Sequence, residues 1–271
     1  MDDFEKEYFE KLKLLAADYS DKRRELAKSR IKMFVAALCR QLLDEGEKFD
    51  LIVAAGNSGL YMSTITKTVY EALGKELPKV ITLPIVRYTP LPDGQLDLFD
   101  NSSLKSTLSG KLTDIPSRAN VLFVDDEIMS ALTLKVAMEL VLGELPELEA
   151  LRCVVIAENH FFEWHYPIPK VQINYFAYSR LIQGLNGNIG YFIPEELYSK
   201  IAAEIPDVKS YNHAMAIVVG GAIKRKDSSG MPIYDFIDSY QEAREPLLKE
   251  LQELVNQGIE EYKSKTIKFR F

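Results

Sequence analysis

The fold that this sequence predicts is decided by one stretch, Val121-Leu122-Phe123-Val124-Asp125-Asp126-Glu127-Ile128-Met129-Ser130-Ala131-Leu132-Thr133. It begins with four apolar residues in a row. Such an unbroken apolar run is typical of a strand that is buried on both faces of a parallel sheet. Two adjacent carboxylates, Asp125 and Asp126, follow directly. Because ligands of open parallel sheets bind beyond the carboxyl ends of the strands, we expect both side chains at the binding edge.

The residues behind the two carboxylates indicate what this site binds. A short loop ends at Thr133, and the apolar residues Leu134, Met138 and Val141 then recur at helical spacing. The free backbone N–H groups at a helix N-terminus favour a phosphate. Paired carboxylates beside such a position therefore predict a sugar phosphate that is held through its hydroxyl groups and a metal ion.

Further segments extend this strand and helix into an α/β fold. The sequence predicts a central, mainly parallel sheet flanked by helices, with N-terminal helices and a C-terminal hood or helical extension. The first βαβ unit consists of a strand at 51–55, the turn Gly56-Asn57-Ser58-Gly59, a helix over 60–73 and a strand at 79–86. Other strands are expected at 151–157 and 171–178, and other helices at 4–15, 26–42, 195–205 and 247–259.

We expect three segments that together form one compact unit. They are an N-terminal helical segment at 1–49, the α/β core at 50–180 and a C-terminal hood with a helical extension at 181–271. With 271 residues and a hydrophobic content of 47%, the chain can bury a substantial core.

Composition narrows the classes of partner. The formal net charge of -7 argues against general electrostatic binding to nucleic acid or to an anionic membrane. The longest nearly apolar stretch, 214–223, is too short to span a bilayer, and the first residues do not resemble a signal peptide. Cys39 and Cys153 lie in apolar patterns and are predicted to be buried, unpaired thiols. A soluble, cytoplasmic protein is therefore expected.

Residues 87–120 show no hydrophobic periodicity and are rich in turn formers such as Pro92-Asp93-Gly94. A connection of this length inside a compact domain is usually functional, often as a lid. Three basic residues are candidates for phosphate contacts: Arg87 at the end of the second strand, and Lys105 and Lys111 in the connection. A surface arginine and solvated loop lysines are the ordinary alternatives.

The apolar strand, the two acidic residues and the hydroxyl-bearing loop before a helix resemble the signature of the type I phosphoribosyltransferases, over roughly residues 50–180. The resemblance implies transfer of the 5-phosphoribosyl group from 5-phosphoribosyl 1-pyrophosphate to a nucleobase or a similar small heterocyclic acceptor, with release of pyrophosphate. It also implies Mg²⁺ as the cofactor and a homodimer as the assembly.

The same resemblance implies roles for individual residues. Asp125 and Asp126 would be the catalytic pair and would bind the ribose hydroxyls, directly or through magnesium-bound water. The 87–120 segment would be the flap that closes over the reacting centre. The 5′-phosphate would be held by Ser130, Ala131, Leu132 and Thr133. The pyrophosphate loop would consist of Ala55, Gly56, Asn57, Ser58 and Gly59.

Two departures from the family pattern keep a second class of function open. Ala131 replaces the glycine expected in the middle of the phosphate loop, and the first loop contains no basic residue. The alternative to an enzyme is a non-catalytic sensor of a ribose phosphate or nucleotide, or a scaffold, on the same fold. Turnover of the donor distinguishes these functions.

Overall fold

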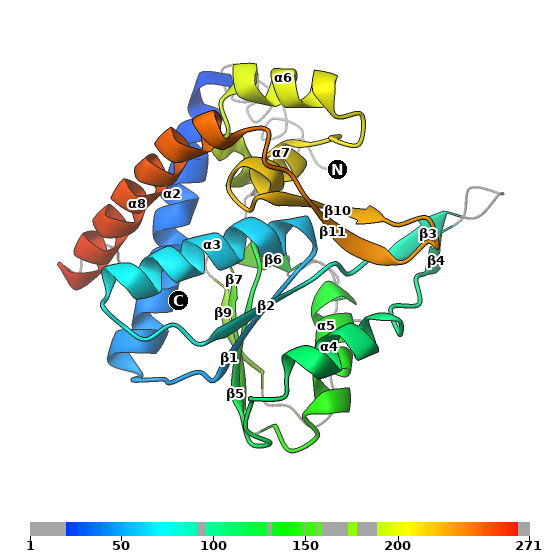
Figure 1. The fold of residues 1–271 in the computed structure, drawn as a ribbon. Helices are drawn as coiled ribbons and strands as arrows, with labels where there is room; N and C mark the ends of the chain where they lie inside the picture. The colour runs from blue at the N-terminus through cyan, green and yellow to red at the C-terminus, as the bar shows by residue number, and fades with distance from the viewer. Residues whose placement is uncertain are drawn as a thin grey trace, which may run out of the picture.

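The computed structural model describes residues 20–90, 96–128, 132–148, 150–155, 157–158, 173–177 and 189–264. These residues form a central five-stranded sheet flanked by helices, so the predicted α/β fold class is confirmed (Figure 1). All neighbouring strands of this sheet are parallel. In spatial order they are β2 (Lys79–Leu83), β1 (Leu51–Ala55), β5 (Asn120–Val124), β7 (Ala150–Val155) and β9 (Ile173–Ala177).

Alternate residues of the central strands point to opposite faces of the sheet and build two hydrophobic cores. On β1, Ile52 and Ala54 belong to one core, whereas Leu51, Val53 and Ala55 belong to the other. All of these side chains are buried. A strand that must fill a core on each face is apolar throughout, which is the pattern that identified it in the sequence.

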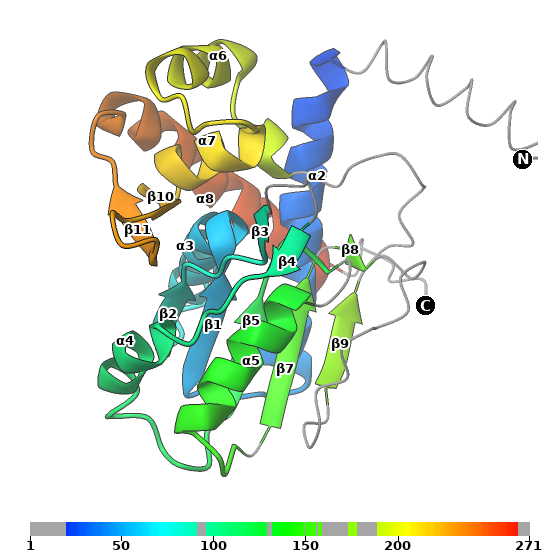
Figure 2. The same ribbon diagram turned by 90° about the vertical axis from the view of Figure 1, so that its right-hand side faces the viewer.

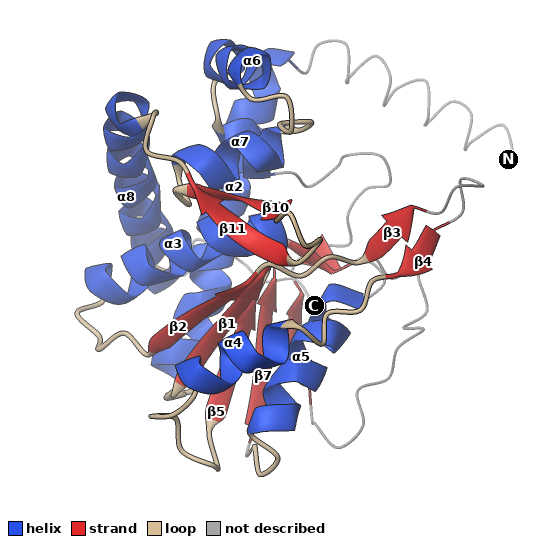
Figure 3. Cartoon of the chain, turned by 45° about the vertical axis from the view of Figure 1, so that its right-hand side comes forward, coloured by secondary structure: helices blue, strands red, loops and turns tan. Residues whose placement is uncertain are grey.

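Different helices cover the two faces, as two turned views show (Figures 2 and 3). The core on one face contains residues of α4 (Leu104–Lys111) and α5 (Leu132–Glu144). The other core contains residues of α2 (Ser20–Cys39), α3 (Gly56–Ala72), α6 (Glu195–Glu204), α7 (Tyr211–Val218) and α8 (Gln241–Lys263). Two short helical turns, Arg40–Asp44 after α2 and Ile189–Phe192 before α6, join these elements.

The C-terminal part of the chain folds back over the first turns of α3 (Figure 1). It contains an antiparallel hairpin of β10 (Ala222–Lys226) and β11 (Pro232–Phe236). Helix α8 then packs along α2, where Lys32 Nζ lies 2.6 Å from Glu261 Oε1. Elements from the two ends of the described chain therefore cover the same face of the sheet.

The prediction of an irregular connection at 87–120 was wrong for much of that segment. It contains the hairpin strands β3 (Tyr88–Pro90) and β4 (Leu96–Leu98) and the helix α4. Leu104 and Leu108 of α4 and Leu112 directly after it are buried, and their spacing of four residues places them on one face of the helix. The surrounding serines, threonine and glycine obscured this apolar face in the sequence. Closure of the segment as a flap stays a prediction.

Two helix starts also differ from the predicted positions. Helix α3 begins at Gly56 instead of residue 60, because the chain turns directly from extended Ala55 into Gly56, whose φ is +68°. Helix α8 begins at Gln241 and includes Pro246, which the sequence had placed in its first turn. Pro246 is thus the sixth residue of α8 and lies beyond its first turn, where it removes one backbone hydrogen bond of the helix.

The structure also bears on several other predictions from the sequence. Cys39 and Cys153 are buried, and neither forms a disulfide within the described residues, as predicted. No helix in the described part of the chain is both long and apolar enough to cross a membrane. Two short strands, β6 (Glu127–Ile128) and β8 (Ala157–Glu158), form a separate parallel pair. The helix expected at 4–15 lies outside the described residues.

Gly59→Ala is expected to destabilise the protein by about 1–3 kcal/mol, the usual effect of overpacking. A Cβ at Gly59 would lie 2.7 Å from the carbonyl carbon of Ala54, so α3 would have to move away from β1. Gly110→Ala is the matched control, because a Cβ there has no neighbour within 4 Å and lies in helix α4. Urea unfolding measures both free energies of unfolding. Equal stabilities for the two variants would contradict this account of the α3–β1 contact.

Candidate functional site

Three strands of the sheet end together at the carboxyl edge, and the candidate site lies there. The register pairs Ala55 of β1 with Leu83 of β2, and Ala54 of β1 with Val124 of β5. The residues that follow these strands are therefore neighbours in space, although they are far apart in the sequence. Among them are Gly56 and Asp125, as the sequence predicted.

Both predicted carboxylates are buried at this edge. The exposed fractions of Asp125 and Asp126 are 5% and 8%. Asp125 Oδ1 accepts hydrogen bonds from Ser58 Oγ at 2.6 Å and from the backbone N–H of Asp126 at 2.9 Å. Asp126 Oδ2 accepts one from the Tyr61 hydroxyl at 2.6 Å. Ser58 and Tyr61 are three residues apart in α3, so one face of this helix orients both carboxylates.

Burial and the like charge of Asp126 raise the pKa of Asp125 well above its usual value, and the hydrogen bond from Ser58 opposes this shift. No described residue forms an ion pair with either carboxylate. The pair therefore lacks a compensating positive charge within the described part of the chain.

The carboxylate oxygens at this edge are suitable ligands for a magnesium ion. Mg²⁺ prefers oxygen ligands and commonly binds through one or two carboxylates, with water and substrate phosphates completing its shell. Asp125 and Asp126 supply two carboxylates, and a divalent cation would compensate their charge. In the described residues no group of three or more His, Cys, Asp or Glu side chains converges on one point, so a metal here would depend on non-protein ligands for the rest of its shell.

The hairpin β10–β11 is attached to the same edge by the tyrosine Tyr234. The Tyr234 hydroxyl lies 2.8 Å from both Gly56 O and Leu83 O, so its single proton is shared between the ends of β1 and β2. Burial and the negative charge of Asp125 raise the pKa of Tyr234 well above its usual value. The hydroxyl therefore stays protonated and serves as a fixed donor beside the carboxylates.

Opposite Tyr234 in the hairpin register lies Lys224. Its backbone N–H donates to Asn57 Oδ1 at 2.8 Å, and its Nζ donates to Ile85 O at 2.8 Å. Burial, together with repulsion from Arg87 and Lys226, lowers the pKa of Lys224 to about 8. A basic side chain thus accompanies the loop that lacks one in its own sequence.

Sequence reasoning missed Lys224, although a signal was present. The segment Lys224-Arg225-Lys226 follows an apolar stretch, and in a strand the first and third residues share a face. The structure shows this alternation. Arg225 points away from Lys224 and pairs with Asp235 at 2.6 Å and Asp207 at 3.2 Å. Tyr61 had no such signal. Ser58 was predicted as a residue of the pyrophosphate loop, and its hydroxyl donates to Asp125.

The candidate phosphate contacts divide into two groups. Arg87 and Lys105 line one cavity of about 320 Å³, together with Phe99, Leu132 and Lys135. Lys111 lies in the last turn of α4 and is not among the residues that line this cavity. A lysine there interacts favourably with the negative end of the helix dipole, which explains it without a ligand.

The two predicted phosphate-binding segments have different outcomes. Gly56, Asn57, Ser58 and Gly59 form the first turn of α3 and not a separate loop. Leu132 and Thr133 are the first residues of α5, with Leu132 buried. Ser130 and Ala131 lie outside the described residues, so the phosphate cradle stays a prediction.

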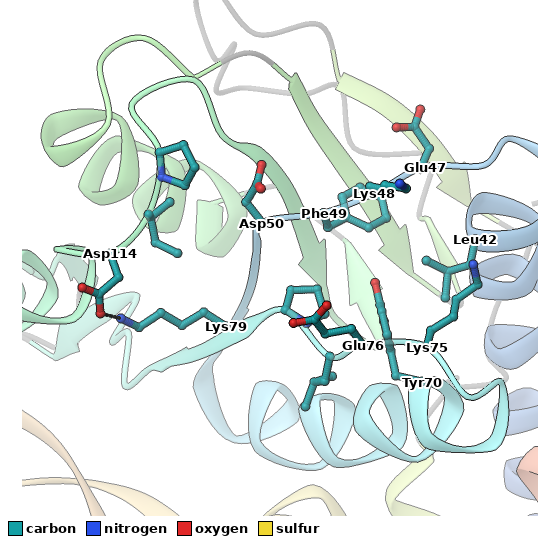
Figure 4. A pocket seen from close by; sticks show the side chains of 14 residues that line it. Leu42, Glu47, Lys48, Phe49, Asp50, Tyr70, Lys75, Glu76, Lys79 and Asp114 are labelled. Carbon is teal, nitrogen blue, oxygen red and sulfur yellow. Dashed lines mark hydrogen bonds and ion pairs between the residues drawn. The ribbon is translucent and has the colours of Figure 1, made fainter.

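A second and larger cavity lies at the opposite, amino edge of the sheet (Figure 4). Its volume is about 810 Å³, and Asp50, Tyr70, Lys79 and Asp114 are among its lining residues. The Tyr70 hydroxyl is buried and has no hydrogen-bond partner in the described part of the chain. None of the predicted site residues lines this cavity, so it is separate from the carboxyl edge.

No model of a known protein family matches the chain, and no curated protein does. Among solved structures, the chain is similar to a hypothetical protein from Neisseria gonorrhoeae with bound ppGpp, at 18% identity over 53% of this chain and 75% of that chain, with a TM-score of 0.36. It is also similar to a purine phosphoribosyltransferase from Pyrococcus horikoshii Ot3, at 19% identity over 54% of this chain and 82% of that chain, with a TM-score of 0.31. Likenesses of this size indicate no function for the chain.

Asp125→Asn is expected to stabilise the ligand-free protein at pH 7, by about 1–3 kcal/mol, because a buried and repelled charge disappears. The Asn Oδ1 can still accept the bonds that Oδ1 of Asp125 receives from Ser58 and Asp126. Urea unfolding in a metal-free buffer measures the change. Asp114→Asn, an exposed carboxylate of the other edge, is the control and should change stability little.

The stabilisation should shrink as the pH falls. The pKa of Asp125 is raised in the folded state, so the folded protein binds this proton more tightly than the unfolded chain does. Wild-type stability from this group is therefore present at low pH and is lost as the pH rises toward the folded pKa. A difference between Asp125→Asn and wild type that grows on acidification would contradict the raised pKa.

Proposed function

We propose that the chain is a magnesium-dependent phosphoribosyltransferase. It would transfer the 5-phosphoribosyl group of 5-phosphoribosyl 1-pyrophosphate to a nucleobase or a similar nitrogenous heterocycle and release pyrophosphate. The observation that supports this most is the buried carboxylate pair at the end of β5, which lies beside the starts of two helices and lacks a cation among the described residues.

The carboxylates would hold the ribose. Asp125 and Asp126 each use one oxygen for the hydrogen bonds from Ser58 and Tyr61, which fixes the orientation of the carboxylate and leaves its second oxygen for another donor. Ribose hydroxyl groups or magnesium-bound water are suitable donors. The backbone N–H groups at the start of α5 would hold the 5′-phosphate without adding another titratable group.

In the reaction, the bond between the anomeric carbon and the pyrophosphate oxygen breaks, and its electron pair leaves with pyrophosphate. The nitrogen lone pair of the acceptor forms the new bond to the anomeric carbon, and the acceptor proton passes to solvent. When bound, Mg²⁺ neutralises charge that develops on the leaving group. The negative carboxylates favour the positive charge that develops on the ribose ring.

A second candidate is a sensor that binds a ribose phosphate or nucleotide without turnover. The internal hydrogen bonds of both carboxylates favour it, because the pair is already satisfied in part by Ser58, Tyr61 and the chain itself. Ala131 in the place of the expected glycine points the same way. Such a protein would bind 5-phosphoribosyl 1-pyrophosphate and leave it intact.

The assay that tests the proposal is pyrophosphate release from 5-phosphoribosyl 1-pyrophosphate with Mg²⁺ and a panel of purine and pyrimidine bases. We expect release with at least one base, and a loss of about 100-fold or more in kcat/KM for Asp125→Asn and Asp126→Asn. Asp114→Asn, at the other edge of the sheet, should retain wild-type rates.

The outcomes separate the two candidates. Binding of 5-phosphoribosyl 1-pyrophosphate without release of pyrophosphate with any base of the panel would contradict the transferase and support the sensor. If the wild-type protein binds neither 5-phosphoribosyl 1-pyrophosphate nor any other ribose phosphate or nucleotide, both functions are excluded. Unchanged rates in both aspartate variants would remove the carboxylate pair from the mechanism.

A further inference from the structure

Three basic residues at the carboxyl edge, Arg87, Lys224 and Lys226, contact neighbouring parts of the chain, and we refer to them as the cation cluster. Lys224 Nζ donates to Ile85 O, and the backbone N–H of Phe99, whose ring Lys226 contacts, donates to Arg87 O at 3.0 Å. Arg87 follows β2, and the two lysines belong to β10. None of the three forms an ion pair with a described residue. Arg225, between the two lysines, differs in that its guanidinium contacts two aspartates. The hairpin thus pairs the basic side chain of one face and leaves those of the other face uncompensated within the described chain.

Lys224 is held in place but keeps spare donors. Its backbone N–H is fixed by Asn57 at the start of α3, and its ammonium group donates to Ile85 O. An ammonium group has three N–H donors, so two are available for a further acceptor. A half-buried ammonium without an ion pair is unfavourable, and a bound anion would compensate it.

One member of the cation cluster, Arg87, lines a cavity. Lys226 Nζ lies 4.4 Å from the centroid of the Phe99 ring. Phe99 and Arg87 both line the cavity of about 320 Å³ that reaches the start of α5 at Leu132. The cluster therefore extends from this cavity, at Arg87, to the first turn of α3, where Lys224 contacts Asn57.

The carboxylates lie beside the same turn as Lys224, since Asn57 accepts from the Lys224 backbone and Ser58 donates to Asp125. Tyr234 faces Lys224 across the hairpin, and the charge of Asp125 acts on Tyr234. Cations and carboxylates therefore flank the same turn between β1 and α3. A ligand that combines an anionic group with sugar hydroxyls and a chelated metal would bind the cations and the carboxylates at the same time.

We propose that the cation cluster binds the diphosphate group of the ligand, with Lys224 of the hood hairpin as its principal contact. The inference rests on the proposed function in one respect, since it takes 5-phosphoribosyl 1-pyrophosphate as the ligand. A single phosphate could satisfy one cation. Three cations from two neighbouring segments match the two or three negative charges of a diphosphate. The C-terminal hairpin would then supply the basic group that the turn at Gly56–Gly59 lacks.

The test is calorimetric titration of inorganic pyrophosphate, with Mg²⁺ present, into the full-length protein. We expect Kd to rise about 10–100-fold in Lys224→Gln and Arg87→Gln, the effect of losing a charge-assisted hydrogen bond. Lys224→Arg should restore much of the affinity. Lys79→Gln removes a lysine from the other edge and should bind pyrophosphate as the wild type does. Circular dichroism and urea unfolding establish that each variant is folded.

The inference is overturned if wild-type protein binds no pyrophosphate, or if Lys224→Gln and Arg87→Gln bind it with wild-type affinity. Turnover in the base panel is scored separately. Weaker pyrophosphate binding in both variants, without turnover by the wild type, supports the cation cluster and rejects the transferase. Turnover with unchanged pyrophosphate affinity supports the transferase and rejects the cluster. Parallel titrations with 5-phosphoribosyl 1-pyrophosphate and a nucleoside 5′-diphosphate show which carrier of the diphosphate is preferred.

Discussion

The structure depends on how two like charges are buried side by side at the end of β5. Asp125 and Asp126 repel one another in a site that solvent scarcely reaches, and such a pair persists only with donors on its oxygens. Those donors come from the first two turns of α3, at Ser58 and Tyr61. Helix α3 must therefore begin directly after β1 and pack closely on it, which Gly59 permits because it has no Cβ.

The core of the fold could be predicted from the sequence because its signals are strong and local. A strand buried on both faces is apolar at every buried position, and all the buried residues of β1 and β5 are apolar. Helix α4 could not be identified in the same way. Its buried leucines share one face, but the intervening small and polar residues are those of a loop. The core that α4 joins is what makes this segment helical.

The site could be predicted in part, for a similar physical reason. The carboxylates follow a readable strand, so their place at the carboxyl edge was evident. The positions of Tyr61, Lys224 and Tyr234 at this edge could not be predicted, because each residue reaches the edge through tertiary contacts. The hairpin lies more than 160 residues from the turn that it contacts, as the bond between Lys224 and Asn57 shows. Nothing local in either segment specifies that pairing.

The β10–β11 hairpin connects the C-terminal part of the chain to the carboxyl edge of the central sheet. Tyr234 joins the ends of β1 and β2, and Lys224 brings positive charge to the turn whose Ser58 holds Asp125. The central claim is that these groups together hold a phosphorylated pentose at the carboxyl edge. A crystal structure with 5-phosphoribosyl 1-pyrophosphate and Mg²⁺ tests it most directly. The account predicts ribose hydroxyls or metal-bound water on Asp125 and Asp126, and a ligand seated instead in the cavity beside Tyr70 would contradict it.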